Sequence, residues 1–416
     1  MSSPDKMSPQ ELRASLSLAG VFGLRMLGLF IILPVFSLHA VQLGGAQSHL
    51  IVGVALGAYG ITQALLQIPF GWLSDRYGRK PIIYFGLGLF ALGSFTAAAA
   101  DNIYWVILGR LIQGAGAISA VVQALAADLT RAEHRTKAMA IIGATIGVSF
   151  ALSIILGPVL NQWIGVPGIF AVTGVLALLA IVIVAKAVPN QRLAEDANPR
   201  RVESRLLLPV LRDGQLFRVN FGIFLLHAAM TGLFIVTPMM LKQSGLLAER
   251  HWQVYLPVVM LSFVLMIPAV MRSDRNGDGK SIALVSIALL AVGFFVLAGA
   301  GTHFWLLCLG LLIFFTTFNV LEASLPAWVS KVATAEHRGT AFSVHSIFQF
   351  LGPPFGGYVS GWLFDHHGAA AVYIFCAALT ILMGLMVWPL RLLPREQNDG
   401  KVWKVIDQQE NLMEGK

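Results

Sequence analysis

The sequence predicts an all-α membrane protein with twelve transmembrane helices in two pseudo-symmetric six-helix bundles. Three observations predict this fold. The chain of 416 residues is 56% hydrophobic, with a mean hydropathy of +0.74, and a soluble domain of this size does not bury that much apolar surface. Its apolar residues form twelve segments of about 20 residues each, which is the length that a membrane helix needs. One long polar stretch divides these segments into six and six.

Each segment is long enough for a helix to satisfy its own backbone groups across a bilayer. The expected spans are residues 15–38, 50–71, 82–100, 103–127, 138–160, 166–188, 217–241, 253–271, 281–300, 303–328, 340–363 and 369–393. The domain organisation follows from them: an N-terminal tail at 1–14, a first bundle at 15–188, a linker at 189–216, a second bundle at 217–394 and a C-terminal tail at 395–416.

The distribution of basic residues predicts the orientation. All but four of the 29 Lys and Arg residues lie on one side of the expected spans, together with both termini. The exceptions are Arg25 and Arg110 inside spans and Lys242 and Arg250 in an opposite loop. Because cytoplasmic loops carry the excess of Lys and Arg, both termini are expected in the cytoplasm.

The two halves of the chain repeat short motifs at matching positions. The tetrapeptide Ala-Glu-His-Arg precedes the fifth span at 132–135 and the eleventh at 335–338. A Gly-Pro pair follows in each of these spans, at 157–158 and 352–353. Such internal repeats are typical of secondary transporters, whose binding cavity lies between the halves.

Composition and motifs argue against several other classes. The net charge of +8 is spread over short loops and not gathered on one domain, so no nucleic-acid partner is expected. Cys308 and Cys376 both lie in spans and are interpreted as small buried hydrophobes. An apparent calcium loop begins at Asp274, but its twelfth position is Val285 inside a span, where a bidentate Glu is needed. We expect no metal and no cofactor.

The charged stretch Gly71–Pro81, between the second and third spans, has two interpretations. One is a solvated turn whose basic residues fix its side of the membrane. The other is a conformational latch, in which Gly71 packs closely against a neighbouring helix and Asp75 accepts hydrogen bonds from the start of another helix. Arg79 would then pair with Asp75 or with a distant acid, for which Asp128 is the candidate. We favour the latch, to which we also assign Arg76, Gly78 and Lys80.

Arg25, Arg110 and Glu322 lie inside spans, where an ionisable residue costs roughly 2.5–3.5 kcal/mol to insert, so we expect them to face the protein interior. Arg110 is either a structural cation or the holder of a proton-carrying or anionic group. Glu322 is either a hydrogen-bonded buried acid or the carboxyl that gains and loses a proton. His227 is either a satisfied core histidine or a proton relay. The full set for proton coupling or the substrate cavity is Arg25, Gln63, Gln67, Arg110, Gln113, His227, Asn319, Glu322, His345 and Gln349.

Glycine and proline in the fifth and eleventh spans either support tight packing or supply moving parts, because Pro kinks a membrane helix and Gly allows close helix contact. The candidates for helix packing are Gly157, Pro158, Gly352, Pro353, Gly356 and Gly357.

The pattern Gly-x-x-x-Asp-Arg-x-Gly-Arg-Lys at 71–80 resembles, without a gap, the loop signature of the major facilitator superfamily. The stretch 108–114 resembles the fourth-span motif of that family, whose arginine, here Arg110, is linked to proton coupling. The Gly-Pro of span five resembles the antiporter motif incompletely, since Ser153, Asn161 and Gln162 stand where glycines are usual. The resemblance covers nearly the whole chain.

More narrowly, the segments 24–28, 67–71, 135–140 and 349–352 resemble drug-efflux-like members of the family from the bacterial inner membrane. This resemblance implies a charge relay of Asp75, Arg79 and Asp128, with Asp75 facing the start of span eleven. Such proteins can carry a small α/β domain after the last span. Because residues 395–416 are short and polar, we do not expect that domain here.

Together these observations predict a proton-coupled efflux antiporter of the inner membrane, which moves a small apolar or amphipathic compound by alternating access and works as a monomer. Its expected partners are the substrate, protons and the lipid bilayer. A proton symporter or a uniporter is the alternative within transport. A membrane-embedded enzyme is disfavoured because the sequence has no nucleophile–base set or metal-ligand cluster, and a sensor because the short tail offers no output domain.

Overall fold

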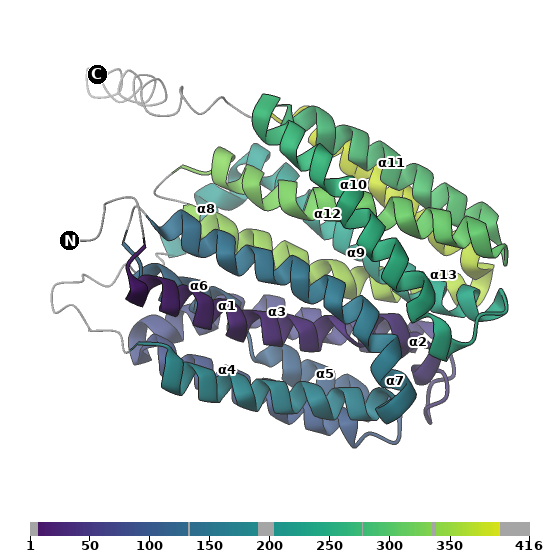
Figure 1. Cartoon of the computed structure of the whole chain (residues 1–416), viewed down its shortest axis with the longest axis horizontal. Helices are drawn as coiled ribbons and strands as arrows, with labels where there is room; N and C mark the ends of the chain where they lie inside the picture. Colours follow the sequence, from purple (N-terminus) through teal and green to yellow (C-terminus); the bar gives the residue numbers. More distant parts are fainter. Residues whose placement is uncertain (1–6, 132–133, 190–203, 277, 335–337, 392–416) are drawn as a thin grey trace.

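The computed structural model describes residues 7–131, 134–189, 204–276, 278–334 and 338–391. Nearly all of these residues are helical (Figure 1). The helices are α1 Pro9–Phe30, α2 Leu33–Ala40, α3 His49–Tyr77, α4 Arg79–Ala98, α5 Ile103–Ala115, α6 Ser119–Asp128, α7 Arg135–Ala187, α8 Ser204–Arg212, α9 Gly214–Gln243, η2 Ala248–Arg250, α10 Trp252–Asn276, α11 Gly279–Ala300, α12 Phe304–Val332 and α13 Arg338–Val387.

Among the described residues, ten helical segments are long and apolar enough to cross a membrane. Two of these segments, α7 and α13, are long enough to cross the membrane twice. The helix α7 runs for 53 residues and is interrupted at Gly165 (φ 63°), and α13 runs for 50 residues and is interrupted at Gly368 (φ 79°). At 1.5 Å per residue each is roughly 75–80 Å long, about twice the thickness of a bilayer. The twelve predicted spans are therefore confirmed.

An even number of crossings places Pro9 and Val387, the first and last helical residues, at the same end of the molecule, here called the terminal end. The opposite end carries His49 at the start of α3 and Asp365 in α13 and is called the far end. The first half, α1 to α7, and the second half, α9 to α13, lie side by side in Figure 1.

The two halves meet along α3 and α13. A Cβ atom at Gly53 would overlap the backbone of Gly357, and a Cβ atom at Gly57 would overlap that of Pro354. Small residues permit this backbone contact between membrane helices. The bond from Ser37 Oγ to the Phe234 carbonyl, at 3.3 Å, also joins the halves near the far end. The halves are thus closed against each other at the far end in this conformation.

Several helices extend beyond the predicted spans. The helix α3 continues through residues 72–77, so the expected loop at 72–81 is helical except at Gly78, whose φ of 92° ends α3. A helix of 29 residues is about 44 Å long, more than the apolar core of a bilayer, so its last turns project beyond the core. The expected tail at 1–14 is helical from Pro9.

The linker between the halves contains α8, which the prediction of a plain polar linker missed. Residues 190–203 of that linker and the tail 395–416 lie outside the described residues. So do parts of both Ala-Glu-His-Arg repeats, at 132–133 and 335–337.

Two predicted spans are broken near the middle of the first half. The first is interrupted at Ile31 and Ile32, between α1 and α2, and the fourth at 116–118, between α5 and α6. A break in a membrane helix frees carbonyl groups that must find other donors. At Gly116 that donor is a buried arginine, described below.

Candidate functional site

The side chain of Arg25 is almost fully enclosed by the first half, with 1% exposure. Its guanidinium donates to Ser119 Oγ at 2.9 Å, to the Tyr59 hydroxyl at 2.6 Å, to Gln63 Oε1 and to the Gly116 carbonyl at 3.1 Å. The break between α5 and α6 frees that carbonyl. Arg25 thus joins three helices through neutral oxygens.

A second buried arginine, Arg110, also lies beside Tyr59. Its Cζ atom is 5.1 Å from the Tyr59 ring centroid, and that of Arg25 is 5.9 Å away. Arg110 donates to Gln113 Oε1 at 3.1 Å and to the Leu56 carbonyl at 3.2 Å. Gln113 in turn donates to Ser94 Oγ at 2.7 Å. Both cations therefore lie within about 6 Å of the centre of the same aromatic ring, and cation–π attraction supplements their hydrogen bonds.

The second half carries a cluster of Glu322, Gln349 and His227. Gln349 Nε2 lies 2.9 Å from Glu322 Oε1 and 3.1 Å from His227 Nε2. His227 Nδ1 lies 3.2 Å from the Ile223 carbonyl, which can only accept. These contacts fit a neutral His227 that donates from Nδ1 and accepts at Nε2 from the amide of Gln349, whose other hydrogen reaches Glu322.

The second oxygen of the Glu322 carboxyl has an incomplete environment. Glu322 Oε2 lies 3.8 Å from His227 Nε2, and it has no hydrogen-bond partner among the described residues although it is buried. An unpaired carboxylate oxygen in a low-dielectric interior is costly. The position therefore suits a carboxyl that is protonated in one state of the protein and charged in another.

A central cavity of about 80 Å³ lies between the two clusters. Polar atoms reach it from both halves: Arg110 and Tyr59 line one wall, and His227 and Gln349 line the other. Most of its remaining lining is apolar, from Phe22, Met26, Leu29, Phe30, Leu33, Leu56, Ile146, Met230, Phe350 and Pro353. Pockets that hold drug-sized ligands have volumes of roughly 300–1,000 Å³, so the halves must separate further before such a ligand fits.

The other predicted cavity residues lie farther from this cluster. Gln63 and Gln67 are buried and bonded to each other, with Nε2 to Oε1 at 2.9 Å. Asn319 donates to Ser262 at 3.2 Å, which joins α12 to α10. His345 Nδ1 lies 3.0 Å from Asn220 Oδ1, which joins α13 to α9. Asn319 and His345, grouped with Glu322 from the sequence, are thus bonded elsewhere within the second half.

At the terminal end, Arg79 binds two acids. Its Nη1 lies 2.5 Å from Asp75 Oδ1, and its Nε lies 3.1 Å from Asp128 Oδ2. Arg79 also donates to Ser74 Oγ at 2.6 Å. The expected pairing of Arg79 with both Asp75 and Asp128 is therefore present, and it joins α3, α4 and α6 within the first half.

The remaining residues of that motif have separate contacts. Arg76 lies over the rings of Trp72 and Tyr77, at 5.8 and 5.5 Å. Lys80 donates to the Val188 carbonyl at 2.7 Å. The expected close packing of Gly71 is wrong for this conformation, because a Cβ atom there would meet no atom within 4 Å. The reason is that α3 and α13 touch at the far end, away from Gly71.

The predicted packing glycines lie at backbone contacts of two kinds. Gly157 faces the Ile31 carbonyl where α1 breaks, and Pro158 follows it inside α7. Gly352 and Gly356 face the backbone of α9 within the second half. Gly357 faces Gly53 across the two halves, and Pro353 lines the central cavity beside it.

Sequence reasoning missed several polar residues that matter for the site. Tyr59 and Ser119 are uncharged and stand among apolar residues, so nothing marked them as partners of Arg25. Asp365 and His49 were not singled out; they lie at the ends of expected spans, in short connections without Lys or Arg. A signal was available in Gly53-x-x-x-Gly57 and Gly357-x-x-x-Gly361, because pairs of small residues at this spacing mark close helix contacts.

Comparisons with known proteins agree with this architecture. A family model for the Major Facilitator Superfamily matches residues 18–275 and 219–406. The inner membrane transport protein YajR of Escherichia coli (strain K12) is 42% identical over 366 residues, which cover 87% of this chain and 80% of that protein. The quinolone resistance protein NorA of Staphylococcus aureus (strain MSSA476) is 24% identical over 374 residues, which cover 84% of this chain and 89% of NorA.

Two solved structures share the fold. The human organic anion transporter MFSD10 superposes with a TM-score of 0.70 at 20% identity, over 91% of this chain and 100% of that one. A bacterial homologue of the human lysosomal transporter Spinster, in an inward-facing and occupied conformation, superposes with a TM-score of 0.73 at 12% identity, over 92% of this chain and 97% of that one. This chain is a multi-pass membrane transporter and not an enzyme, and it belongs to the major facilitator superfamily.

Proposed function

We propose that this protein is a proton-coupled antiporter of the bacterial inner membrane that exports a small apolar or amphipathic compound. The observation that carries the proposal is the Glu322–Gln349–His227 cluster beside a largely apolar cavity. Relatives named for inner-membrane transport and for quinolone resistance support the direction of transport. The cavity is formed within one chain, so the protein would act as a monomer.

The proton would move through Glu322. While the cavity is open to the outside, Glu322 takes up a proton, which removes the cost of a buried unpaired charge. When the cavity opens to the cytoplasm, the carboxyl releases that proton to water and the resulting carboxylate keeps the hydrogen bond from Gln349. His227, 3.8 Å from Glu322 Oε2, can relay the proton because its neutral Nε2 accepts one.

The cavity wall formed by the first half, across from His227 and Gln349, supplies a fixed positive potential. Arg110 and Arg25 donate only to neutral oxygens in the contacts described above. Their positive charge would attract an anionic group that enters the small cavity. An exported compound would lie against the apolar lining between these two walls.

The latch at Asp75, Arg79 and Asp128 belongs to the conformational step. The excess of Lys and Arg at the terminal end supports a cytoplasmic location for that end. In our proposal the terminal end closes when Asp75 accepts hydrogen bonds from the start of α13, and Arg79 and Asp128 hold Asp75 in place. In the conformation described here the far end is closed, and Asp75 binds Arg79 instead.

Purified protein in liposomes with an internal pH dye tests the proton coupling. Under an imposed pH gradient, a screen of small apolar compounds should find one whose addition changes the internal pH in the wild type. Glu322→Gln keeps the size and the bond to Gln349 but cannot ionise, so we expect its proton flux to fall at least tenfold. Equal proton flux in wild type and Glu322→Gln would contradict the assignment of Glu322. Proton and compound moving in the same direction would replace antiport by symport.

A further inference from the structure

A carboxylate from one half caps a helix of the other half at the far end. Asp365 Oδ1 accepts the backbone N–H of His49 at 2.9 Å, and Oδ2 accepts that of Leu50 at 3.0 Å. His49 and Leu50 are the first two residues of α3, and such N–H groups have no partner inside their own helix. Asp365 Oδ1 also lies 2.6 Å from His49 Nδ1.

The N-cap residue of α3 itself does not bind the first backbone N–H groups of the helix. Ser48 is the N-cap of α3, and serine is among the best N-cap residues, but its side chain makes no capping hydrogen bond here. Asp365, which is more than 300 positions away in the chain, occupies the place that Ser48 would fill. A negative charge there also meets the positive end of the α3 dipole.

The cap lies at the end of the backbone contact between the halves. Gly361, one turn before Asp365, faces the backbone of His49 and Leu50. The backbone contact between α3 and α13 continues through Gly357 and Gly53. The ring of Phe364 lies edge-on to that of His49, with centroids 4.4 Å apart. If the halves separated at this end, α13 would carry Asp365 away from α3 and all three of its contacts to His49 and Leu50 would be lost.

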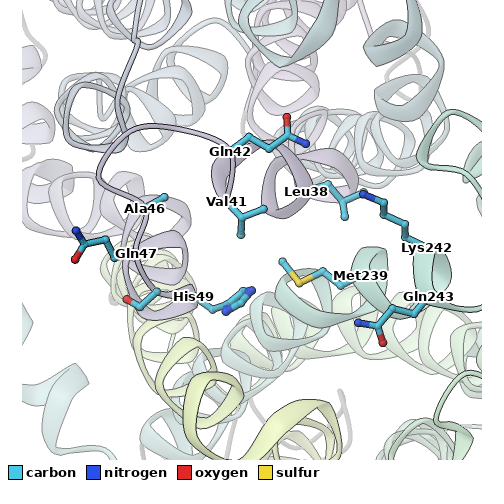
Figure 2. A pocket seen from close by; sticks show the side chains of 10 residues that line it. Leu38, Val41, Gln42, Ala46, Gln47, His49, Met239, Lys242 and Gln243 are labelled. Atoms are coloured by element: carbon cyan, nitrogen blue, oxygen red, sulfur yellow. The ribbon is translucent and has the colours of Figure 1, made fainter.

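The carboxylate is charged under ordinary conditions. Burial raises the pKa of Asp365, but the hydrogen bonds from the amides of His49 and Leu50 and from the His49 ring lower it by more, so the net pKa lies below the usual value. His366 and His367 follow Asp365 in the chain, and Lys242 on α9 is another ionisable group at the far end. Lys242 and His49 line the same far-end pocket of about 500 Å³ (Figure 2).

We propose that Asp365 is a far-end clasp, which caps α3 across the two halves only while the far end is closed and thereby holds the transporter open toward the terminal end. The second and eleventh spans run antiparallel, so the clasp mirrors the proposed latch. Asp75 lies in the last turn of α3 and is proposed to meet the start of α13, whereas Asp365 of α13 caps the start of α3. Rocking of the halves would break one contact as it forms the other. The proposal rests on alternating access and on no particular substrate.

Distances across the far end test the clasp directly. Gln47 and Gln243 are exposed, lie in different halves and line opposite sides of the far-end pocket (Figure 2). Spin labels at Gln47→Cys and Gln243→Cys, with Cys308 and Cys376 replaced by Ala, report this separation in lipid nanodiscs by pulsed electron resonance. We expect Asp365→Ala to raise the ratio of far-end-open to far-end-closed protein about tenfold, as loss of charge-assisted hydrogen bonds predicts. Asp101→Asn, an exposed far-end acid within one half, should leave the ratio unchanged.

A second pair of variants separates a clasp from a purely local helix cap. Ser48→Asp supplies a cap to α3 from its own half. In the Asp365→Ala background, Ser48→Asp should restore the start of α3 but leave the far end open. In the wild-type background, Ser48→Asp should compete with Asp365 and open the far end. Recovery of the closed distance in Ser48→Asp/Asp365→Ala would overturn the clasp, as would an unchanged distance in Asp365→Ala.

These outcomes do not depend on the proposed transport activity, because the distances are measured without substrate or a proton gradient. Unchanged distances in Asp365→Ala, together with lost proton flux in Glu322→Gln, would reject the clasp and keep the antiporter. Shifted distances with no proton-linked export would keep the clasp and reject the antiporter.

Discussion

The shape of the cation at position 110 matters as well as its charge. Arg110 donates in two directions, to Gln113 and to the Leu56 carbonyl, while its Cζ atom lies 5.1 Å from the Tyr59 ring centroid. Lysine carries the same charge but has no planar fork. We expect Arg110→Lys to insert normally and to lower transport at least tenfold, because the ammonium cannot keep all three contacts.

Flux per amount of protein in the membrane, measured beside Arg250→Lys, checks this prediction. Arg250 is exposed in η2 at the far end and belongs to neither the cavity nor the latch. Equal losses in both variants would indicate a general effect of replacing arginine and would remove the special role of Arg110.

Charge decided which residues could be predicted from the sequence. Arg25, Arg110 and Glu322 were identified because an ion inside a span is costly and so must have a purpose. Their partners Tyr59, Ser119 and the Gly116 carbonyl were missed, because neutral groups carry no such penalty and their positions depend on how helices are rotated. Asn319 and His345 were wrongly grouped with Glu322 because helix rotation is not known from the sequence. The sequence gives the depth of a residue in the membrane but not the helix that it faces.

At the scale of helices, α1 is fixed to the loop after α6 by one acid. Glu11 accepts from the backbone N–H of Arg131 at 2.8 Å and from its Nε at 3.0 Å, and it also caps the start of α1 at Ser8. Glu11 precedes the apolar segment that starts at residue 15. The hydrogen bond from the Arg131 side chain lowers the pKa of Glu11 from 4.5 to about 2, against the raising effect of burial.

We expect Glu11→Gln to lower the stability of the folded protein at neutral pH by about 1–3 kcal/mol, the usual contribution of charge-assisted hydrogen bonds. Because the folded pKa is depressed, this contribution is full above about pH 4.5 and is lost as the pH falls toward 2. Thermal unfolding in detergent at both ends of that range measures it. Glu249→Gln, at an exposed far-end acid, is the control, and a wild-type advantage that persisted below pH 2 would contradict the ion-pair explanation.

The number of helices was more predictable than their ends. Apolar length gave all twelve spans, but the helix α3 runs six residues past its apolar segment, and α8 forms inside a stretch interpreted as linker. Both additions lie outside the apolar segments, where hydropathy gives no signal. The breaks at Ile31–Ile32 and at 116–118 were missed because their residues are as apolar as their neighbours.

For the whole molecule, the proposed alternating access requires that closure at one end accompany opening at the other, so the contacts at the two ends would compete. The structure describes the state closed at the far end, in which α3 and α13 are joined through Gly53, Gly357 and Asp365. A few charge-assisted hydrogen bonds at either end suffice to bias such an equilibrium, since two conformations in exchange differ by only a few kcal/mol. Single charge changes at the terminal end should therefore alter transport without unfolding the protein.

Arg79 is shared between Asp75 and Asp128, and this sharing ranks the variants of the latch. Arg79→Gln leaves both carboxylates without that partner and should impair transport more than Asp128→Asn, which keeps the Arg79–Asp75 pair. Asp75→Asn should also impair transport with membrane insertion intact, because it removes the group proposed to meet α13.

The exchange Arg79→Asp/Asp128→Arg restores a pair of opposite charges between positions 79 and 128 but places an acid four residues after Asp75. Its flux should accordingly lie between that of Arg79→Asp alone and the wild type, and flux no higher than in Arg79→Asp would leave the direct contact without a role in transport.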